Sequence, residues 1–282
     1  MVKQEHRILK NLTDLLGSRA PLAIAYSGGL DSRFLCFVAL RAHIDCLALT
    51  VTGPHIASHE TRFAKQWAQE RLLPLIEYPL DITSLEGLSK NPRTRCYLCK
   101  KRMFQNFKTL LLERKEEGRC LCDGSNEDDL EEFRPGAKAL KEEAIFSPLQ
   151  ELNLRKAMIR SLASTIGLSY PSQKPSPCLL TRFNYGLSLT KKTLFHLAKA
   201  EEELKRLFYA EKRDGELTDT VFRLRLTPTP ILTITRFPWD KAKQVHTTLA
   251  KHHFLPCYLL ESPTISGFYD RPLPSLHNLP LL

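Results

Sequence analysis

Residues 22–32 read LAIAYSGGLDS: an apolar run is followed at once by two glycines, an aspartate and two serines. The run predicts a short buried strand, and the apolar stretch RFLCFVALRA at 33–42 predicts a helix directly behind the polar residues. Glycines let the backbone approach a ligand closely, and the free N–H groups of a helix start attract anions. The stretch therefore predicts an anion-binding loop at a strand–helix junction.

Strand and helix patterns continue to alternate after this loop. We expect further strands at 46–51, 75–78 and 119–124, and further helices at 58–72, 99–115 and 154–167. Strands separated by helices pair in parallel, and such a sheet carries helices on both faces. The predicted fold class is α/β, with a doubly wound parallel sheet.

A change in amino-acid composition marks the start of a second, smaller domain. Residues 170–177 read YPSQKPSP, and the three prolines are typical of a linker or an active-site loop. The residues beyond predict an α+β domain, with an amphipathic helix at 190–210, alternating strands within 222–237 and a helix at 239–253. We predict domains at 1–172 and 173–282.

Composition excludes several classes of protein. Hydrophobic residues make up 43% and charged residues 26% of the 282, the balance of an ordinary globular protein and not of a disordered chain or a coiled coil. No stretch approaches the roughly 18 uncharged apolar residues of a membrane span, and the charged residues 1–20 do not resemble a signal peptide. We therefore expect a cytoplasmic protein with no membrane partner.

The net charge of +10, from 41 Lys and Arg against 31 Asp and Glu, favours a partner that carries phosphate. A nucleotide and an RNA both meet that description, and solubility alone also accounts for the excess. The eight cysteines do not indicate a disulfide framework in a cytoplasmic chain of this length. Cys36 and Cys46 lie in apolar runs, and we expect them in the core.

The side chains of the 27–32 loop suit a nucleotide bound together with a metal. Ser27 and Ser32 supply hydroxyl donors beside Gly28 and Gly29, and Asp31 suits a Mg²⁺ ion that bridges phosphates. The loop lacks the lysine of a GxxxxGK[ST] motif, so it is not a Walker loop. SGGLDS resembles the pyrophosphate (PP) loop of the ATP pyrophosphatases, which adenylate an oxygen and release pyrophosphate; a plain Gly-Gly turn is the alternative.

Three later segments indicate which family among the ATP pyrophosphatases the chain resembles. They are NPRTRCYLCKKRMF at 91–104, DGSNEDDLEEFRPGAKALKEEAIFSPL at 123–149 and KPSPCLLTRFNYG at 174–186. Their order and spacing behind SGGLDS resemble the LarE family, the ATP-dependent pyridinium-3,5-biscarboxylic acid mononucleotide sulfurtransferases that make the nickel-pincer nucleotide cofactor. The resemblance is dense from Tyr26 to Thr190 and thins beyond. It implies the PP-loop fold of the adenine nucleotide alpha hydrolases.

The family resemblance implies a reaction in two steps on a small-molecule nucleotide substrate. ATP and Mg²⁺ convert a carboxylate of the pyridinium mononucleotide into an acyl-adenylate, and a sulfur nucleophile then attacks it. The cysteine of the third segment bears the sulfur in the family, which gives that role to Cys178. Lys174 and Arg182 are cationic neighbours that favour its thiolate. Asp31 and Cys178 are thus the expected catalytic residues.

Two versions of the sulfur donor occur in the family, and this chain has the residues for both. In one version the cysteine is sacrificed to dehydroalanine. In the other, three cysteines hold a [4Fe-4S] cluster with one open iron; here Cys96, Cys99 and Cys178 would be the ligands, and we favour this version. A CxxC is also compatible with a redox pair, half of a zinc site or two unrelated thiols. Cys120 and Cys122 are expected to be structural.

Other residues are expected to bind ATP or the acceptor. Thr52, after the second strand, and Gly124, in the GSN stretch, are expected beside ATP. Arg95 before the CxxC, Arg134 in RPG and Arg182 are expected anion contacts for the substrate. Most of the acidic residues within 127–132 are expected to form an exposed helix start. Lys100 is expected to be either an anion contact or a solvated surface charge.

Arg223 and Arg225 alternate on one strand face, and they match an element that holds the substrate phosphate in the family. The sequence then departs from the family, because residues 230–233 read PILT where the family has Ala-Arg-Ile-Glu. One arginine and one acidic residue are therefore missing. Glu201 or Glu202 is a candidate replacement carboxylate, unless both lie on a solvated helix face.

The divergent second domain leaves the sulfur acceptor open. A tRNA is the alternative acceptor for a basic chain, although the basic residues are spread along the sequence and not clustered. An amidoligase similar to NAD synthetase would leave the three cysteines without a role, and a non-catalytic nucleotide-binding protein would not need Cys178. Ring-shaped homo-oligomers occur in the family, which implies self-association.

Overall fold

The computed structural model describes residues 2–130, 135–209, 220–227 and 229–282. The chain divides into two units. The first comprises Met1–Asp81 and Thr94–Ser176, and the second comprises Ile82–Arg93 and Pro177–Leu282. A short segment from the N-terminal half of the chain therefore belongs to the C-terminal unit. In the described ranges, no helix is both long and apolar enough to cross a membrane.

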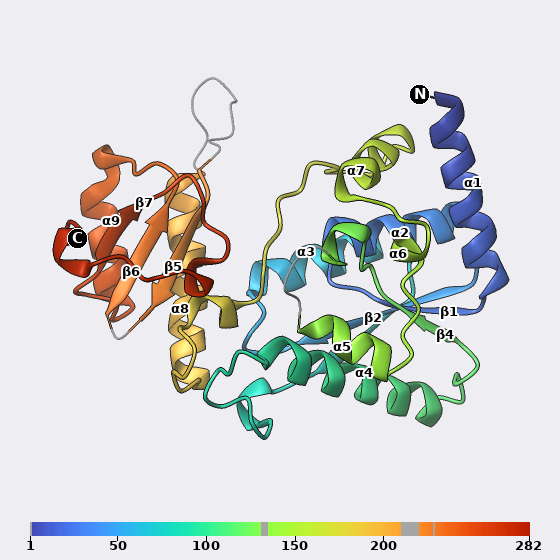
Figure 1. Cartoon of the computed structure of the whole chain (residues 1–282), viewed down its shortest axis with the longest axis horizontal. Helices are drawn as coiled ribbons and strands as arrows, with labels where there is room; N and C mark the ends of the chain where they lie inside the picture. Colours follow the sequence, from blue (N-terminus) through green and yellow to red (C-terminus); the bar gives the residue numbers. More distant parts are fainter. Residues whose placement is uncertain (1, 131–134, 210–219, 228) are drawn as a thin grey trace. The chain divides into compact units, whose positions relative to one another are not determined.

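A four-stranded parallel sheet forms the centre of the first unit (Figure 1). Its strands lie in the order β3-β2-β1-β4, with bounds Leu22–Ala25 (β1), Cys46–Thr52 (β2), Leu75–Pro79 (β3) and Cys120–Cys122 (β4). The helices of this unit are Val2–Ser18 (α1), Leu30–Arg41 (α2), Ser58–Gln69 (α3), Arg95–Glu113 (α4), Gly136–Glu142 (α5), Pro148–Glu151 (α6) and Lys156–Thr165 (α7). The predicted α/β class with a parallel sheet is confirmed.

Helices cover both faces of this sheet, because successive strand residues point to opposite sides. Leu22 and Ile24 of β1 pack into one apolar cluster with residues of α1, α2, α3 and α7. Ala23, between them, packs into a second cluster with residues of α4 and α5. Figure 1 shows α4 and α5 on the opposite side of the sheet from α2. The strands are therefore apolar on both sides, which is why they appear as continuous apolar runs in the sequence.

The buried thiols of the first unit have structural positions. Cys36, Cys46 and Cys122 are buried in the first cluster, and Cys120 packs partly buried against it. Burial raises the pKa of each thiol, that of Cys46 to about 11. A thiol that stays protonated in apolar surroundings is a poor nucleophile. These four cysteines are therefore part of the core, as the sequence analysis expects.

The strand order creates a switch point between β1 and β4. The chain runs from β1 outward through β2 to β3, and it then returns to the other side of β1 as β4. In open α/β sheets, ligands bind outside the carboxyl ends of the strands at such a point. The loops that follow β1 and β4 therefore frame the place where a ligand is expected.

The second unit contains a three-stranded mixed sheet in the order β5-β6-β7. Strands Phe222–Leu226 (β5) and Pro230–Ile234 (β6) are antiparallel, and Tyr258–Glu261 (β7) is parallel to β6. Helices Lys191–Phe208 (α8) and Ala242–Lys251 (α9) contact each other, and α8 also contacts β5. Short 3-10 helices occur in both units, at Ile82–Ser84, Glu127–Leu130, Leu179–Arg182, Trp239–Lys241, Phe268–Asp270 and Leu276–Asn278.

Candidate functional site

The loops after β1 and β4 meet at the switch point of the first unit. A Cβ atom on Gly124, after β4, would lie 3.0 Å from the backbone nitrogen of Ser32 and 3.1 Å from Cβ of Asp31. A side chain at position 124 would require the backbone at Asp31 and Ser32 to shift by a few tenths of an ångström, which favours glycine there. In this structure Gly124 contacts the 27–32 loop, and its expected contact with ATP stays a prediction.

Gly28 lets the 27–32 loop turn tightly against α3. Its φ of +75° favours glycine, and a Cβ atom there would lie 2.7 Å from Cβ of Ala64. The loop is closed from within, because Ser27 Oγ accepts from the N–H of Gly29 while Ser32 Oγ donates to the carbonyl of Gly29. The loop is thus preformed at the start of α2, where backbone N–H groups favour an anion.

Asp31 is the charged centre of the site. Its Oδ2 lies 2.5 Å from Nζ of Lys156, the first residue of α7, and 3.4 Å from Nδ2 of Asn126. Its Oδ1 is buried and accepts no hydrogen bond from the residues that the structure describes. A buried carboxylate oxygen without a donor is costly, and it is the kind of ligand that a hard cation such as Mg²⁺ takes. The residues present therefore fit the metal expected at Asp31.

Lys156 and Asn126 are site residues that the sequence analysis does not predict. One signal points to Lys156: a lysine at the first position of a helix opposes the helix dipole, which favours acidic residues there. Such a lysine is expected to pair with a nearby carboxylate. The backbone N–H of Lys156 also donates to Oδ2 of Asp128 at 2.8 Å. Asp128 therefore caps α7 and is not merely an exposed acidic residue.

A second carboxylate, Asp123, lies buried in the loop after β4. It accepts hydrogen bonds from the hydroxyls of Ser125 at 2.6 Å and Ser147 at 2.7 Å, and the Lys100 ammonium lies 3.6 Å away. Lys100 comes from α4, the helix that carries the CxxC motif. This ion pair therefore joins α4 to the switch point, and Lys100 is more than a surface charge.

Cys96 and Cys99 lie near the start of α4. Cys96 is exposed and Cys99 is partly buried, and their i, i+3 spacing places both on one face of the helix. Arg95, the first residue of α4, is buried. The described parts of the chain contain no group of three or more His, Cys, Asp or Glu side chains placed to hold a metal ion. Because Cys178 belongs to the other unit, a cluster shared by the three cysteines stays a prediction.

Cys178 directly precedes the 3-10 helix Leu179–Arg182, and it is partly buried. Arg182 holds its backbone: Nη1 donates to the carbonyl of Pro177 at 2.7 Å and to that of Cys178 at 3.3 Å. The Arg182 guanidinium also pairs with Glu201, with Nη2 2.9 Å from Oε2. Glu201 and Glu202 are each 9% exposed, so the solvated helix face considered for them is wrong. Arg182 positions the segment around Cys178, and its contact with substrate stays a prediction.

Arg225 is more deeply buried than Arg223, which lies two residues before it on β5. It is 4% exposed, it donates to the carbonyls of Thr181 and Ile265, and its guanidinium lies 4.5 Å from the ring centroid of Phe268. Burial lowers its pKa to about 10. Arg223 is only partly buried. Binding of an acceptor phosphate by this pair stays a prediction, and Arg223 is the more accessible of the two.

Thr52 and His55 lie at the carboxyl end of β2. Thr52 ends the strand and is partly buried. His55 is 4% exposed, and its Nδ1 has no hydrogen-bond partner within the described ranges. Burial lowers the pKa of His55 to about 4, so its imidazole is neutral at pH 7. Arg134, expected to contact the substrate, lies outside the described residues.

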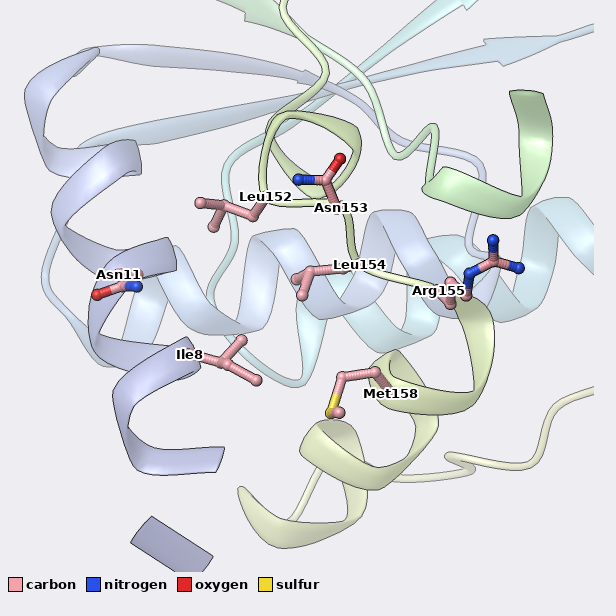
Figure 2. A pocket seen from close by; sticks show the side chains of 7 residues that line it. All are labelled: Ile8, Asn11, Leu152, Asn153, Leu154, Arg155 and Met158. Atoms are coloured by element: carbon pink, nitrogen blue, oxygen red, sulfur yellow. The ribbon is translucent and has the colours of Figure 1, made fainter. Parts of the chain in front are cut away.

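A cavity of about 280 Å³ lies close to the start of α7, but none of the predicted site residues lines it (Figure 2). Its lining is mostly apolar and comes from α1, from the segment that leads into α7 and from α7 itself. The lining residues are Ile8, Asn11, Leu152, Asn153, Leu154, Arg155 and Met158. The cavity is therefore separate from the polar residues around Asp31.

The chain is similar in sequence to several known proteins. No protein-family profile matches the chain. The chain is similar to the uncharacterized protein slr1717 of Synechocystis, with 32% identity over 206 residues that cover 73% of this chain and 76% of that protein. The uncharacterized protein MJ0830 of Methanocaldococcus jannaschii is 31% identical, over 65% of this chain and 69% of that protein. The pyridinium-3,5-bisthiocarboxylic acid mononucleotide synthase of Lactiplantibacillus plantarum is 26% identical, over 68% and 70%.

Proposed function

This chain belongs to the family of the Synechocystis protein slr1717, and we propose that it is an ATP-dependent sulfurtransferase acting on a carboxylate of a pyridinium mononucleotide. The similarity to the Lactiplantibacillus plantarum synthase supports an enzyme. The product named for that relative carries two thiocarboxylate groups. Replacement of a carboxylate oxygen by sulfur, in the biosynthesis of a nickel-pincer cofactor, is the reaction that this similarity favours.

The arrangement of residues around Asp31 is the observation that supports the binding of ATP. A glycine turn at the start of α2 faces the switch point, and Asp31 follows it with one buried oxygen that accepts no hydrogen bond from the described residues. Lys156 adds a positive charge on the other oxygen. Backbone N–H groups, an ammonium and a carboxylate suited to Mg²⁺ are the groups that a triphosphate requires.

In the first step, a carboxylate oxygen of the acceptor attacks the α-phosphorus of ATP. A new P–O bond forms, the bond to the bridging oxygen breaks, and pyrophosphate leaves. The 27–32 loop binds the departing phosphates through its backbone, and Lys156 compensates charge beside Asp31. Mg²⁺, when bound, neutralises the charge that develops on the phosphate oxygens.

In the second step, sulfur attacks the acyl carbon and AMP leaves. If Cys178 itself is the nucleophile, its thiolate forms a thioester as AMP leaves. A base then removes the Cα proton of Cys178, a Cα–Cβ double bond forms, and the Cβ–S bond breaks with its electron pair on sulfur, which releases the thiocarboxylate and leaves dehydroalanine at position 178. Arg182 fixes the carbonyls of Pro177 and Cys178, so the backbone that carries the thiol is held in place. The alternative donor is a [4Fe-4S] cluster held by Cys96, Cys99 and Cys178, which would supply sulfide from its open iron.

Asn91 bonds the backbone that follows Cys178 within the second unit. The side-chain amide of Asn91, in the second unit, donates to the carbonyls of Phe183 at 2.9 Å and Asn184 at 3.1 Å. Cys96 follows Asn91 by five residues, which span at most about 18 Å when fully extended. Five residues of chain therefore separate Cys96 from the residue that bonds the backbone after Cys178.

The test is the mass of the acceptor after incubation with the anaerobically purified protein, MgATP, pyridinium-3,5-biscarboxylic acid mononucleotide and sulfide. We expect the acceptor to gain the mass difference between sulfur and oxygen only when ATP is present. The Asp31→Asn variant should fail, whereas Asp45→Asn, which changes an acidic side chain that is 64% exposed, should behave as the wild type. ATP consumption with an unchanged acceptor would contradict the proposed substrate.

A further inference from the structure

Arg33 is a buried cation whose contacts join two segments of the first unit. Its side chain is 0% exposed, although it directly follows the 27–32 loop in the sequence. Nε donates to the carbonyl of Gly28 at 3.1 Å, while Nη1 donates to the carbonyl of Ser169 at 2.7 Å. Nη2 donates to the carbonyl of Tyr170 at 3.2 Å and to Oε1 of Gln173 at 2.6 Å. One guanidinium thus holds the glycine turn and the segment 169–173 together.

Rings and a second arginine hold the 169–173 segment from the side of α3. The guanidinium of Arg33 lies 5.2 Å from the ring centroid of Phe63, and that ring packs edge-on against Tyr170 at 5.9 Å. Trp67 Nε1 donates to the hydroxyl of Ser169 at 3.3 Å, and Arg71 Nη2 donates to the same hydroxyl at 3.2 Å. Of these side chains, Arg33 is the one that also bonds the glycine turn.

The partners of Arg33 argue for a geometric role. Among the residues that the structure describes, it bonds only neutral oxygens and contacts rings, and no carboxylate pairs with it. Burial accordingly lowers its pKa. Burial of a charge without an opposite charge is unfavourable. The presence of such a group here is therefore best explained by the geometry of its hydrogen bonds. A planar group with donors in a fixed fork can bridge three backbone carbonyls in a way that lysine cannot.

We propose that Arg33 is a positioning residue that couples nucleotide binding at the Gly28 turn to the order of the segment 169–173, which leads within five residues to Cys178. The inference rests on the proposed function. A nucleotide that holds the backbone of the Gly28 turn also fixes the carbonyl that accepts from Nε of Arg33. The remaining donors of the same rigid group then hold the carbonyls of Ser169 and Tyr170. Occupancy of the nucleotide site thereby orders the chain that precedes the sulfur donor.

The test is amide hydrogen exchange of residues 169–174 in the full chain, with and without a non-hydrolysable ATP analogue and Mg²⁺. In the wild type, we expect the analogue to slow exchange of this segment. In Arg33→Met, the segment should exchange faster without nucleotide, and the analogue should no longer protect it. Arg71→Met is the matched control, because Arg71 bonds the same segment but not the Gly28 turn; nucleotide-dependent protection should persist.

A second variant keeps the test decisive if Arg33→Met does not fold. Coupling is reciprocal, so Gln173→Leu, which removes one partner of Arg33 outside the nucleotide loop, should weaken binding of the analogue by about fivefold or more. Ser172→Ala, at the exposed neighbouring position, should leave the affinity unchanged. Equal affinity in Gln173→Leu and the wild type would overturn the inference, as would a bound analogue that leaves exchange of 169–174 unchanged. A wild type that binds no nucleotide would instead overturn the proposed function, and this inference with it.

Discussion

Nζ of Lys156 lies 2.5 Å from Oδ2 of Asp31, so an ion pair ties the start of α7 to the start of α2. The two residues are 125 positions apart in the sequence. The pair leaves Oδ1 of Asp31 buried and without a hydrogen bond from the described residues. Asp31 Oδ1 would hold a cation such as Mg²⁺, and the charge of that cation would add to the charge of Lys156 in favouring the phosphates of a nucleotide.

Replacement of Lys156 should impair nucleotide binding more than folding. In Lys156→Met we expect the KM for MgATP to rise roughly 10- to 100-fold, because a hydrogen bond between charged groups contributes about 1.5–3 kcal/mol. Arg155→Met is the control, because Arg155 is 55% exposed in its pair with Asp128 and such surface pairs contribute about 0–1 kcal/mol. A normal KM for Lys156→Met would show that the lysine only neutralises Asp31.

Protonation of His55 should make the first unit less stable in acid. Its pKa is about 4 in the folded protein against an ordinary value of 6.5, so the unfolded chain binds more protons between these values. Stability from this group is complete above pH 6.5 and is lost as the pH falls towards 4. Between pH 7 and pH 4.5, we expect a loss of about 2–3 kcal/mol. His55→Phe should remove that part of the loss.

The measurement is urea unfolding in a Trp239→Phe background, where the buried Trp67 reports on the first unit. His246→Phe, a change at an exposed histidine of the second unit, serves as the control and should leave the pH dependence of the Trp67 signal as in the wild type. Identical pH dependence in the wild type and His55→Phe would show that His55 does not titrate in this range.

The ion pair of Arg182 with Glu201 should stabilise the second unit. Both side chains are nearly buried, and removal of one charge leaves the other buried without an opposite charge. In Glu201→Gln we expect a loss of about 3–5 kcal/mol. In Glu202→Gln, whose partner Arg206 is 73% exposed, we expect about 0–1 kcal/mol. Amide exchange of β5, whose Leu224 N–H donates to Glu201, measures both; equal effects would contradict this role.

The two sulfur-donor hypotheses predict different iron contents in three variants. If Cys96, Cys99 and Cys178 share a four-iron cluster, replacement of any one by serine should remove most iron and sulfide from protein purified without oxygen. Cys120→Ser, a change in the sheet, should retain the metal. If Cys178 is sacrificed, only Cys178→Ser should stop sulfur transfer. Normal transfer without iron by both Cys96→Ser and Cys99→Ser would exclude the cluster.

The central sheet and its loop are predictable from the sequence because their signals are local. Strands β1 and β2 are covered on both faces and therefore appear as apolar runs, and SGGLDS shows the glycines that the tight turn at Gly28 requires. Helix α7 is predicted at 154–167 and observed at Lys156–Thr165, since its apolar spacing is visible within one segment.

Residues whose roles depend on distant partners are not predictable in the same way. Lys156 contacts Asp31 because α7 packs beside α2, and its place at a helix start suggests a carboxylate partner without showing that the partner is Asp31. The place of Ile82–Arg93 in the second unit likewise depends on hydrogen bonds from Asn91 to carbonyls about ninety positions later. Glu201 reads as part of an ordinary charged helix, and its burial becomes evident only with Arg182 opposite it.

The products formed from ATP test the central claim most directly. The protein is incubated with MgATP and pyridinium-3,5-biscarboxylic acid mononucleotide, and the nucleotides and phosphates are separated by ion-exchange chromatography. Because the 27–32 loop is proposed to bind pyrophosphate as it leaves, we predict equal amounts of AMP and pyrophosphate, formed only with the acceptor present and absent in Asp31→Asn. ADP and orthophosphate as the products would contradict the account.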